Sequence, residues 1–148
     1  MVMKGYSYDN ELLYVCCLIE FIGRKQLTER STVVNKIGYD GLQHIYEFSD
    51  VLHSDNIEAV ADKYIKKYGI RRGTYNNVEK CEYKVPFYGD IAYVYMSLIG
   101  SQQGDKIEKL IEVYNSWIAD KINNYNLAVY FRTPEYLYLS YKEGKLLD

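Results

Sequence analysis

Residues 12–23 read LLYVCCLIEFIG: eight apolar residues, then Glu20, two further apolar residues and a glycine. Such a run is too short to cross a bilayer, which takes about 20 apolar residues in a helix, but it suits a helix buried in a core. We therefore expect a helix over about residues 9–24 that ends near Gly23. The protein built around it should be mainly α-helical.

Glu20 interrupts this apolar run, and a carboxylate sealed in a core without a partner is costly. On a helical wheel Glu20 shares one flank with Asp9, Cys16, Cys17 and Arg24. Arg24 follows Glu20 by one turn, in the order that stabilises an exposed helix by about 0.2–0.5 kcal/mol. We therefore expect a narrow polar strip in which Glu20 pairs with Arg24, and Glu20→Leu should leave folding intact.

The composition is that of one folded domain. The chain has 148 residues, of which 48% are hydrophobic and 26% charged, and its formal net charge is −2. This balance excludes a disordered chain and a membrane protein. Acidic and basic residues are spread evenly, without the basic stretch that phosphate binding requires, so the sequence argues against nucleic acid as a partner. It predicts no particular oligomeric state.

Capping residues and periodicity predict helices in the first half. Thr28 can cap a short helix that stops at Gly38, and the next helix is expected over about residues 40–53. Asp55 and Glu58 have the spacing of a capping box, which predicts a fourth helix that ends at a glycine.

The second half gives similar signals. A helix is expected over about residues 90–99, and Asp105 with Glu108 forms a capping box for the longest helix, which should reach Tyr125. Thr133–Glu135 supplies an N-cap, a first-turn proline and an acid, which favours a last helix. The segments LAVYF and YLYLSY could instead pair as a hairpin.

Residues 70–87, IRRGTYNNVEKCEYKVPF, break the helical pattern. They should form a loop or a short strand, so the places for a strand or hairpin are 70–87 and 126–141. We expect one domain, residues 1–148, of about six or seven helices. The loop would join an N-terminal four-helix part, 1–69, to a C-terminal helical part, 88–148.

This loop also supplies the candidate binding residues. They are Arg71, Arg72, Tyr75, Asn76 and Asn77. Cationic, aromatic and amide groups on an irregular segment are typical of binding sites. The alternative is a solvated connector whose arginines form ion pairs with a neighbouring helix.

The cysteines and histidines predict neither a disulfide framework nor a metal site. Cys16, Cys17 and Cys81 are odd in number and form no CxxC, which favours a reducing compartment. Cys16 and Cys17 point about 100° apart on a helix and cannot both face one metal, so we interpret them as small hydrophobes. His44 and His53, nine residues apart, would lie on opposite helix faces.

No phosphate-binding loop, nucleophile elbow or metalloprotease motif occurs in the sequence. We therefore predict no catalytic residue, no metal and no cofactor. The first eleven residues lack the charged flank and cleavage site of a signal peptide, so a cytoplasmic location is expected. The eighteen tyrosines fit either an aromatic core layer or an interface.

Residues 28–48 have the outline of a helix-turn-helix, with a short helix, a glycine turn and a longer helix. A recognition helix should offer Arg, Lys, Asn or Gln to the bases. The second helix here reads YDGLQHIYEFSDVLH, with one glutamine, three acids and no Lys or Arg. Because acids repel phosphate, DNA binding is the weakest of the functional hypotheses.

Residues 11–65 contain, in order, ELLYVCCLIEF, LTERSTVVNKIG and LQHIYEFSDVLHSDNIEAVADKYI. This order resembles a family of small helical bacterial domains of unknown function, often encoded beside ADP-ribosyltransferase-like, toxin-like proteins. The matching residues are Tyr46, Glu47, Leu52, His53, Ile57 and Asp62. The chain departs at 54–56, where the family tends to have a Thr-Gly turn, and in a C-terminal half that the family lacks. The resemblance implies a helical fold and carries over no catalytic residue.

These observations favour a non-enzymatic protein–protein interaction module, either an antitoxin or immunity-type partner or a phage-derived inhibitor of a bacterial protein. One alternative is a small-molecule or nucleotide-binding protein, or an enzyme, with a tyrosine-lined pocket and Arg71 and Arg72 as an anion clamp. The other alternative is the helix-turn-helix DNA binder.

Overall fold

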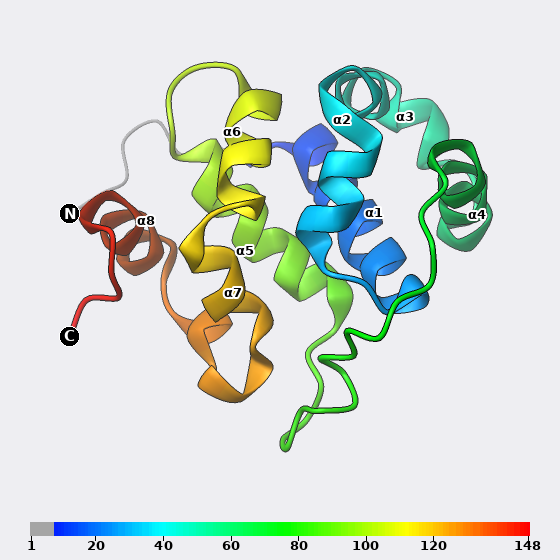
Figure 1. Ribbon diagram of the computed structural model, residues 1–148. Coiled ribbons are helices and arrows are strands. Elements are labelled where there is room, and N and C mark those ends of the chain that lie inside the picture. The colour runs from blue at the N-terminus through cyan, green and yellow to red at the C-terminus, as the bar shows by residue number, and fades with distance from the viewer. Residues whose placement is uncertain (1–7) are drawn as a thin grey trace.

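The computed structural model describes residues 8–148, and every regular element within them is helical (Figure 1). The mainly α-helical fold is therefore confirmed, with eight α-helices in this part of the chain. Residues 1–7, which carry most of the signal-peptide prediction, lie outside the described residues. The elements are α1 Asn10–Gln26, α2 Arg30–Glu47, α3 Ser49–Leu52, α4 Ile57–Tyr68, α5 Tyr88–Gly100, α6 Lys106–Tyr114, α7 Trp117–Asn123, the 3₁₀ turns η1 Tyr125–Leu127 and η2 Val129–Phe131, and α8 Pro134–Glu143.

Both strand alternatives are wrong. Between α4 and α5 the described chain runs as an irregular strap without a strand, and residues 126–141 form the two 3₁₀ turns and α8. In residues 126–141 Thr133 favours the helix over the hairpin, because its Oγ1 accepts a hydrogen bond from the Tyr136 backbone N–H at 3.1 Å and so caps α8.

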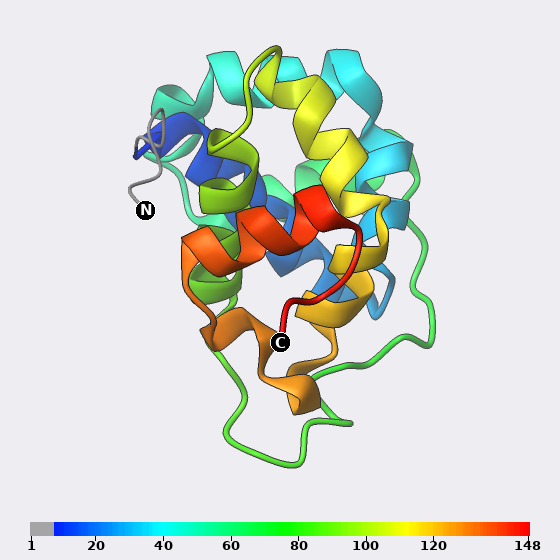
Figure 2. The ribbon, with the colours of Figure 1, turned by 90° about the vertical axis from the view of Figure 1, so that its left-hand side faces the viewer.

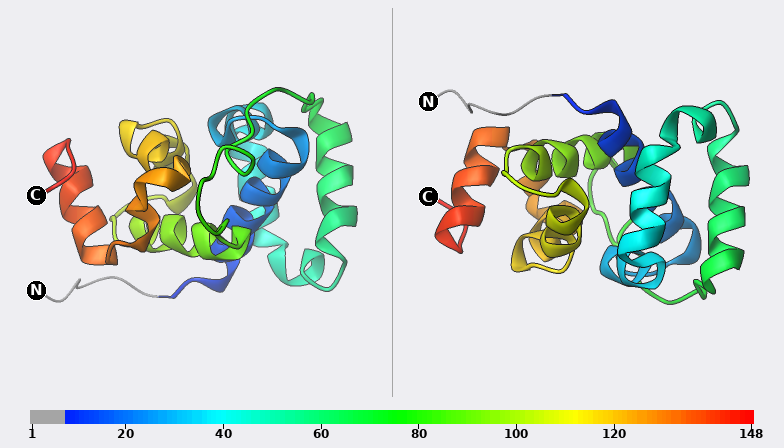
Figure 3. Two further views of the ribbon diagram at one scale, coloured as in Figure 1. Left: turned by 90° about the horizontal axis from the view of Figure 1, so that it is seen from below. Right: turned by 90° about the horizontal axis from the view of Figure 1, so that it is seen from above.

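The helix α1 is the centre of the molecule, as its apolar run indicates. It packs against α2, α3, α4 and α5 (Figures 1 and 3). Its N-cap Asp9 accepts a hydrogen bond from the Leu12 backbone N–H at 3.0 Å. The helix continues past Gly23 to Gln26, where Leu27 takes a left-handed conformation that turns the chain back toward α2.

The buried apolar side chains form one cluster that extends into both halves of the chain. In the second half α5 packs against α1, α6 and α8. Helices α4 and α8 lie at opposite ends of the molecule (Figure 1), and the segment from 70 to 87 runs from α4 along the lower side of the molecule to the start of α5 (Figures 1 and 2).

Two predicted N-caps are corrected. Asn56, not Asp55, caps α4, since its side chain accepts a hydrogen bond from the Glu58 backbone N–H at 2.7 Å. Thr28 does not cap α2, which begins at Arg30 behind an extended Glu29 that makes no side-chain cap. Asp105 does cap α6, as predicted, with hydrogen bonds from the backbone N–H groups of the next turn.

The long helix predicted from residue 105 to 125 is also wrong, because it breaks between α6 and α7. The Asn115 side chain donates to the Ile111 carbonyl at 2.8 Å, and Ser116 Oγ donates to the Val113 carbonyl at 2.7 Å. Short polar side chains of this kind compete with the backbone for helix carbonyls and end a helix. A second break lies within α2, where Gly38 has a φ of 75° and kinks the helix at the predicted stop.

The tyrosines differ in burial. Tyr64, Tyr95 and Tyr114 are fully buried in the core, whereas Tyr83 and Tyr93 are exposed. Within residues 8–148 no helix is both long and apolar enough to cross a membrane.

Candidate functional site

Glu20 pairs with Arg30, and the predicted pairing with Arg24 is wrong. Arg30 Nε donates to Glu20 Oε1 at 3.1 Å, and both side chains are almost fully buried. The approach depends on Gly23, because a Cβ at that position would lie 2.6 Å from Arg30 Nε. Glu20 is therefore a buried charge with a partner from the next helix. Glu20→Leu would leave Arg30 buried without this partner, so it should destabilise the fold, contrary to the expectation from the sequence.

The second oxygen of Glu20 is also occupied. Tyr114 donates its hydroxyl to Glu20 Oε2 at 3.0 Å, and Asn123 Nδ2 donates to Oε1 at 3.3 Å. Tyr95 donates to the Asn123 side chain and stacks on Tyr114 with ring centroids 4.0 Å apart. Burial, and then the Glu20 carboxylate, raise the pKa values of Tyr95 and Tyr114 well above the usual value. This buried network joins α1, α2, α5, α6 and α7.

Arg24 holds two distant segments together instead of pairing with Glu20. Its Nη2 donates to the Pro86 carbonyl at 2.6 Å and to the Tyr125 hydroxyl at 3.1 Å. Pro86 lies on the strap before α5, and Tyr125 begins η1. One guanidinium therefore ties the strap to the 3₁₀ turns.

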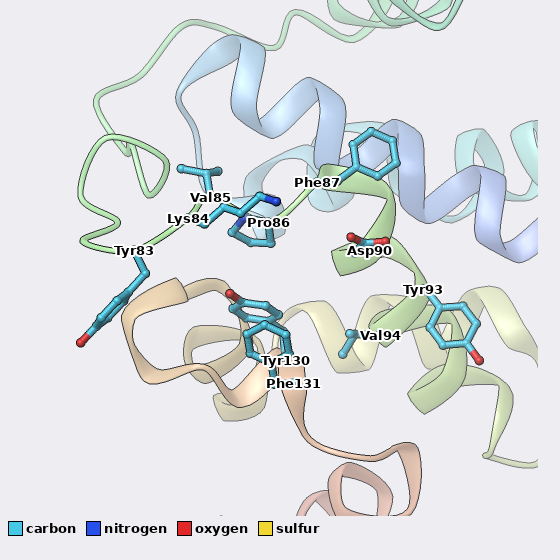
Figure 4. A pocket seen from close by; sticks show the side chains of 10 residues that line it. All are labelled: Tyr83, Lys84, Val85, Pro86, Phe87, Asp90, Tyr93, Val94, Tyr130 and Phe131. Carbon is cyan, nitrogen blue, oxygen red and sulfur yellow. The ribbon is translucent and has the colours of Figure 1, made fainter.

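Between these two segments lies a groove of about 620 Å³, which we call the aromatic groove (Figure 4). One wall is the strap, the second is the first two turns of α5, and the third is η2. The lining residues are Tyr83, Lys84, Val85, Pro86, Phe87, Asp90, Tyr93, Val94, Tyr130 and Phe131.

The aromatic groove is bordered by large apolar side chains that solvent reaches. Phe131 is 77% exposed, Tyr83 71% and Phe87 59%. Tyr130 packs edge-on against Tyr125 at 5.9 Å between centroids, so the η2 wall rests on the residue that Arg24 binds. Apolar side chains are normally exposed singly, and a contiguous exposed patch is a common feature of interaction surfaces and ligand-binding grooves, which makes this groove the candidate site.

Local sequence explains why both walls are irregular. Pro86 has no N–H and restricts Val85 to an extended conformation, so the strap does not continue as helix into α5. Ala128 has a φ of 56°, which separates η1 from η2 and brings Tyr130 and Phe131 round to the strap. Asn126 then fastens the strap, since its amide donates to the Lys80 carbonyl at 3.0 Å and accepts from the Glu82 backbone N–H at 2.8 Å.

The charges at the aromatic groove are balanced. Lys84 and Asp90 are its two charged lining residues within the described chain, and both are exposed. The groove therefore presents a mainly apolar surface that carries one positive and one negative group.

The structure does not bring all five predicted binding residues into one pocket among those described for residues 8–148. Arg71 and Arg72 are exposed, line no wall of the aromatic groove and make no ion pair within residues 8–148. Asn76 caps a local turn by accepting from the Glu79 backbone N–H at 3.0 Å. Asn77 is buried and accepts from Arg30 Nη2 at 3.3 Å, and the Tyr75 ring centroid lies 6.0 Å from the Arg30 guanidinium carbon.

Sequence reasoning missed the aromatic groove. Its aromatic residues lie in segments without helical period, in YKVPF at 83–87 and in the YF pair at 130–131. Aromatic residues beside a proline in an irregular segment were the available signal.

The cysteines are free, and Cys16 is buried. Burial raises the pKa of Cys17 to about 11 and that of Cys16 well above its usual value, so both thiols stay protonated near neutral pH. Among residues 8–148 no group of His, Cys, Asp and Glu side chains has the arrangement of a metal site.

Comparison with known proteins gives no relative. No protein-family model, no curated protein and no solved structure matches the chain. The resemblance of residues 11–65 to a bacterial helical family therefore stays a prediction.

Proposed function

We propose that this chain is a non-enzymatic protein–protein interaction module that binds its partner through the aromatic groove. The expected kinds of partner are the same as those proposed from the sequence. The chain would act as an antitoxin or immunity-type partner, or as a phage-derived inhibitor of a bacterial protein, in the cytoplasm.

The observation that carries the proposal is the exposure of Tyr83, Phe87 and Phe131 around one groove. Leaving such side chains in water gives up about 1.5–3 kcal/mol each relative to burial. Tyrosine and other aromatic anchors supply much of the binding free energy in protein interfaces, where they fill pockets near the centre. A partner that covers the groove would recover this free energy.

The groove walls are also fixed before any partner arrives. Arg24 ties the strap to Tyr125, and Asn126 ties it again at Lys80 and Glu82. A preformed site loses less conformational entropy on binding than a loop that must order itself. The irregular segments can therefore act as a rigid binding surface.

The lining defines the chemistry of the partner segment. It should place an apolar or aromatic side chain between Pro86 and Phe131, flanked by polar groups that can meet Lys84 and Asp90. Because the groove has no net charge, the partner needs no strong charge of either sign.

The test is co-purification of the tagged chain at its natural expression level. The variants are Phe131→Ser, Tyr83→Ser and, as a control, Val51→Ser on α3, which removes an exposed apolar side chain that does not line the groove. A stoichiometric protein should stay with the original chain and with Val51→Ser, and be lost from the two groove variants. Recovery of no protein, or equal recovery with all variants, would contradict the proposal.

A further inference from the structure

A second concavity lies between the same two stretches of chain, on the side of the buried network. We call it the polar hollow; its volume is about 350 Å³. It is within the size range of small-ligand sites, about 300–1,000 Å³. Its lining residues are Tyr75, Asn77, Lys80, Asp120, Asn123, Asn124, Tyr125 and Asn126.

The back of the polar hollow is rigid. Asn77 Nδ2 donates to the Asn123 carbonyl at 2.9 Å, while its oxygen accepts from Arg30. The Asn123 amide is held by Glu20, and the Tyr125 hydroxyl by Arg24. These groups use their hydrogen bonds within the protein, and so they fix the shape of the hollow before any ligand binds.

The front of the hollow carries groups with no such partner. Within residues 8–148 no hydrogen bond or ion pair is made by the Tyr75 hydroxyl, the Lys80 ammonium, the Asp120 carboxylate or the Asn124 amide nitrogen. Three of them donate, two of them can accept, and they come from both sides of the hollow. Tyr75 adds an aromatic ring that is only partly covered.

We infer that the polar hollow binds an uncharged, polyhydroxylated small molecule of monosaccharide size. Lys80 and Asp120 carry opposite charges, so the hollow has no net charge and favours neither a phosphorylated nor a cationic ligand over an uncharged one. Each hydroxyl of a sugar both donates and accepts, which matches a front that mixes the Asp120 acceptor with the Lys80 and Asn124 donors. The apolar face of the sugar ring would rest on Tyr75.

This inference is independent of the protein partner, because the aromatic groove and the polar hollow share no lining residue. It also differs from the anion clamp expected from the sequence. Tyr75 and Asn77 of the predicted set line the hollow, but Arg71 and Arg72 do not.

The test is saturation-transfer NMR on the full chain with glucose, galactose, mannose, ribose, N-acetylglucosamine and, as a planar alternative, uridine. At least one sugar should bind, with a Kd on the order of 1 mM. Asp120→Ala and Lys80→Ala should each weaken it about tenfold or more, because each removes a hydrogen bond to a charged group. The matched controls Asp40→Ala and Lys121→Ala change exposed charges that do not line the hollow and should leave binding unchanged.

Three results would overturn the inference: no sugar binds, uridine alone binds, or the hollow variants bind as well as the controls. All four substitutions replace exposed side chains, so folding should be preserved. Far-ultraviolet circular dichroism of each variant checks this before the titration.

Discussion

Arg30 Nε lies 3.1 Å from Glu20 Oε1, and this ion pair is sealed between the central helix and the helix that follows it. Neither side chain is more than 2% exposed. Removing one partner of a buried pair leaves an uncompensated charge, which typically costs about 3–5 kcal/mol. Glu20→Leu should therefore lower the free energy of unfolding by about that amount, measured by urea denaturation.

The surface provides the control for this measurement. Lys25 lies 2.9 Å from Glu58 and 3.1 Å from Asp62, but solvent reaches these groups, so Lys25→Ala should lower the free energy of unfolding far less than Glu20→Leu. The double variant Glu20→Leu with Arg30→Met should be destabilised by less than the sum of its single changes. Additive losses would show that the two side chains do not act as a pair.

Gly23 gives a second prediction, in which local and tertiary preferences oppose each other. In an exposed helix interior Gly→Ala stabilises by about 1 kcal/mol. Here the added Cβ would lie 2.6 Å from Arg30 Nε, so Gly23→Ala should lower the melting temperature. In the Arg30→Ala background the space is free and the sign should reverse. A stabilising Gly23→Ala in the original chain would contradict the packing.

Alkaline pH should unfold the protein through its tyrosines. Burial raises the pKa of Tyr14 to about 12, and burial with the Asp9 hydrogen bond raises that of Tyr46 to about 12. An unfolded tyrosine has a pKa of about 10. Because the folded values are higher, the unfolded chain loses these protons first, so the free energy of unfolding keeps its full value below about pH 10 and falls as the pH rises toward about 12. The free energy of unfolding, measured across this range, should fall.

The variant Tyr14→Phe tests whether Tyr14 contributes to this loss of stability at alkaline pH. The Tyr14 hydroxyl is buried without a hydrogen-bond partner in the described part of the chain. Its removal should leave stability at pH 7 unchanged or raised, and it should flatten the alkaline decline. An unchanged pH profile in Tyr14→Phe would place the decline on other residues.

Arg24 should stabilise the walls of the aromatic groove but contribute little to the stability of the helical core. Arg24→Met removes the hydrogen bonds to Pro86 and Tyr125 and releases the strap. Hydrogen exchange of the amides between 81 and 88 should become about tenfold faster or more, since hydrogen bonds to charged groups contribute about 1.5–3 kcal/mol. Exchange in the core of α1 should stay close to that of the original chain, with Lys25→Ala as the neighbouring control. Equal acceleration everywhere would mean that Arg24 supports the whole fold.

Most of the helices can be predicted from the sequence because helices form from local signals. The apolar run of α1, the Asp105 cap and the Thr133–Pro134 start are all read within a few residues, and all are confirmed. Predictions fail where a contact depends on a residue that is distant in the sequence. Glu20 had a plausible partner one turn away, but the left-handed turn at Leu27 brings Arg30 against α1 instead.

The aromatic groove could not be predicted from the sequence for the same reason. The aromatic groove exists because Arg24, Pro86 and Tyr125 meet across more than half of the chain, and no local pattern records that meeting. The binding residues predicted from the sequence lie in the polar first part of residues 70–87. The exposed aromatic side chains lie at the other end of this segment, next to Pro86.

Photocrosslinking at the aromatic groove in living cells tests most directly whether the groove binds a protein. A photoreactive phenylalanine analogue at position 131 should give one discrete crosslinked species with a partner protein, since this side chain is 77% exposed at the groove edge. The same analogue at position 51, 67% exposed on α3, should give none. Crosslinking at 51 but not at 131, or at neither position, would contradict a groove that binds protein.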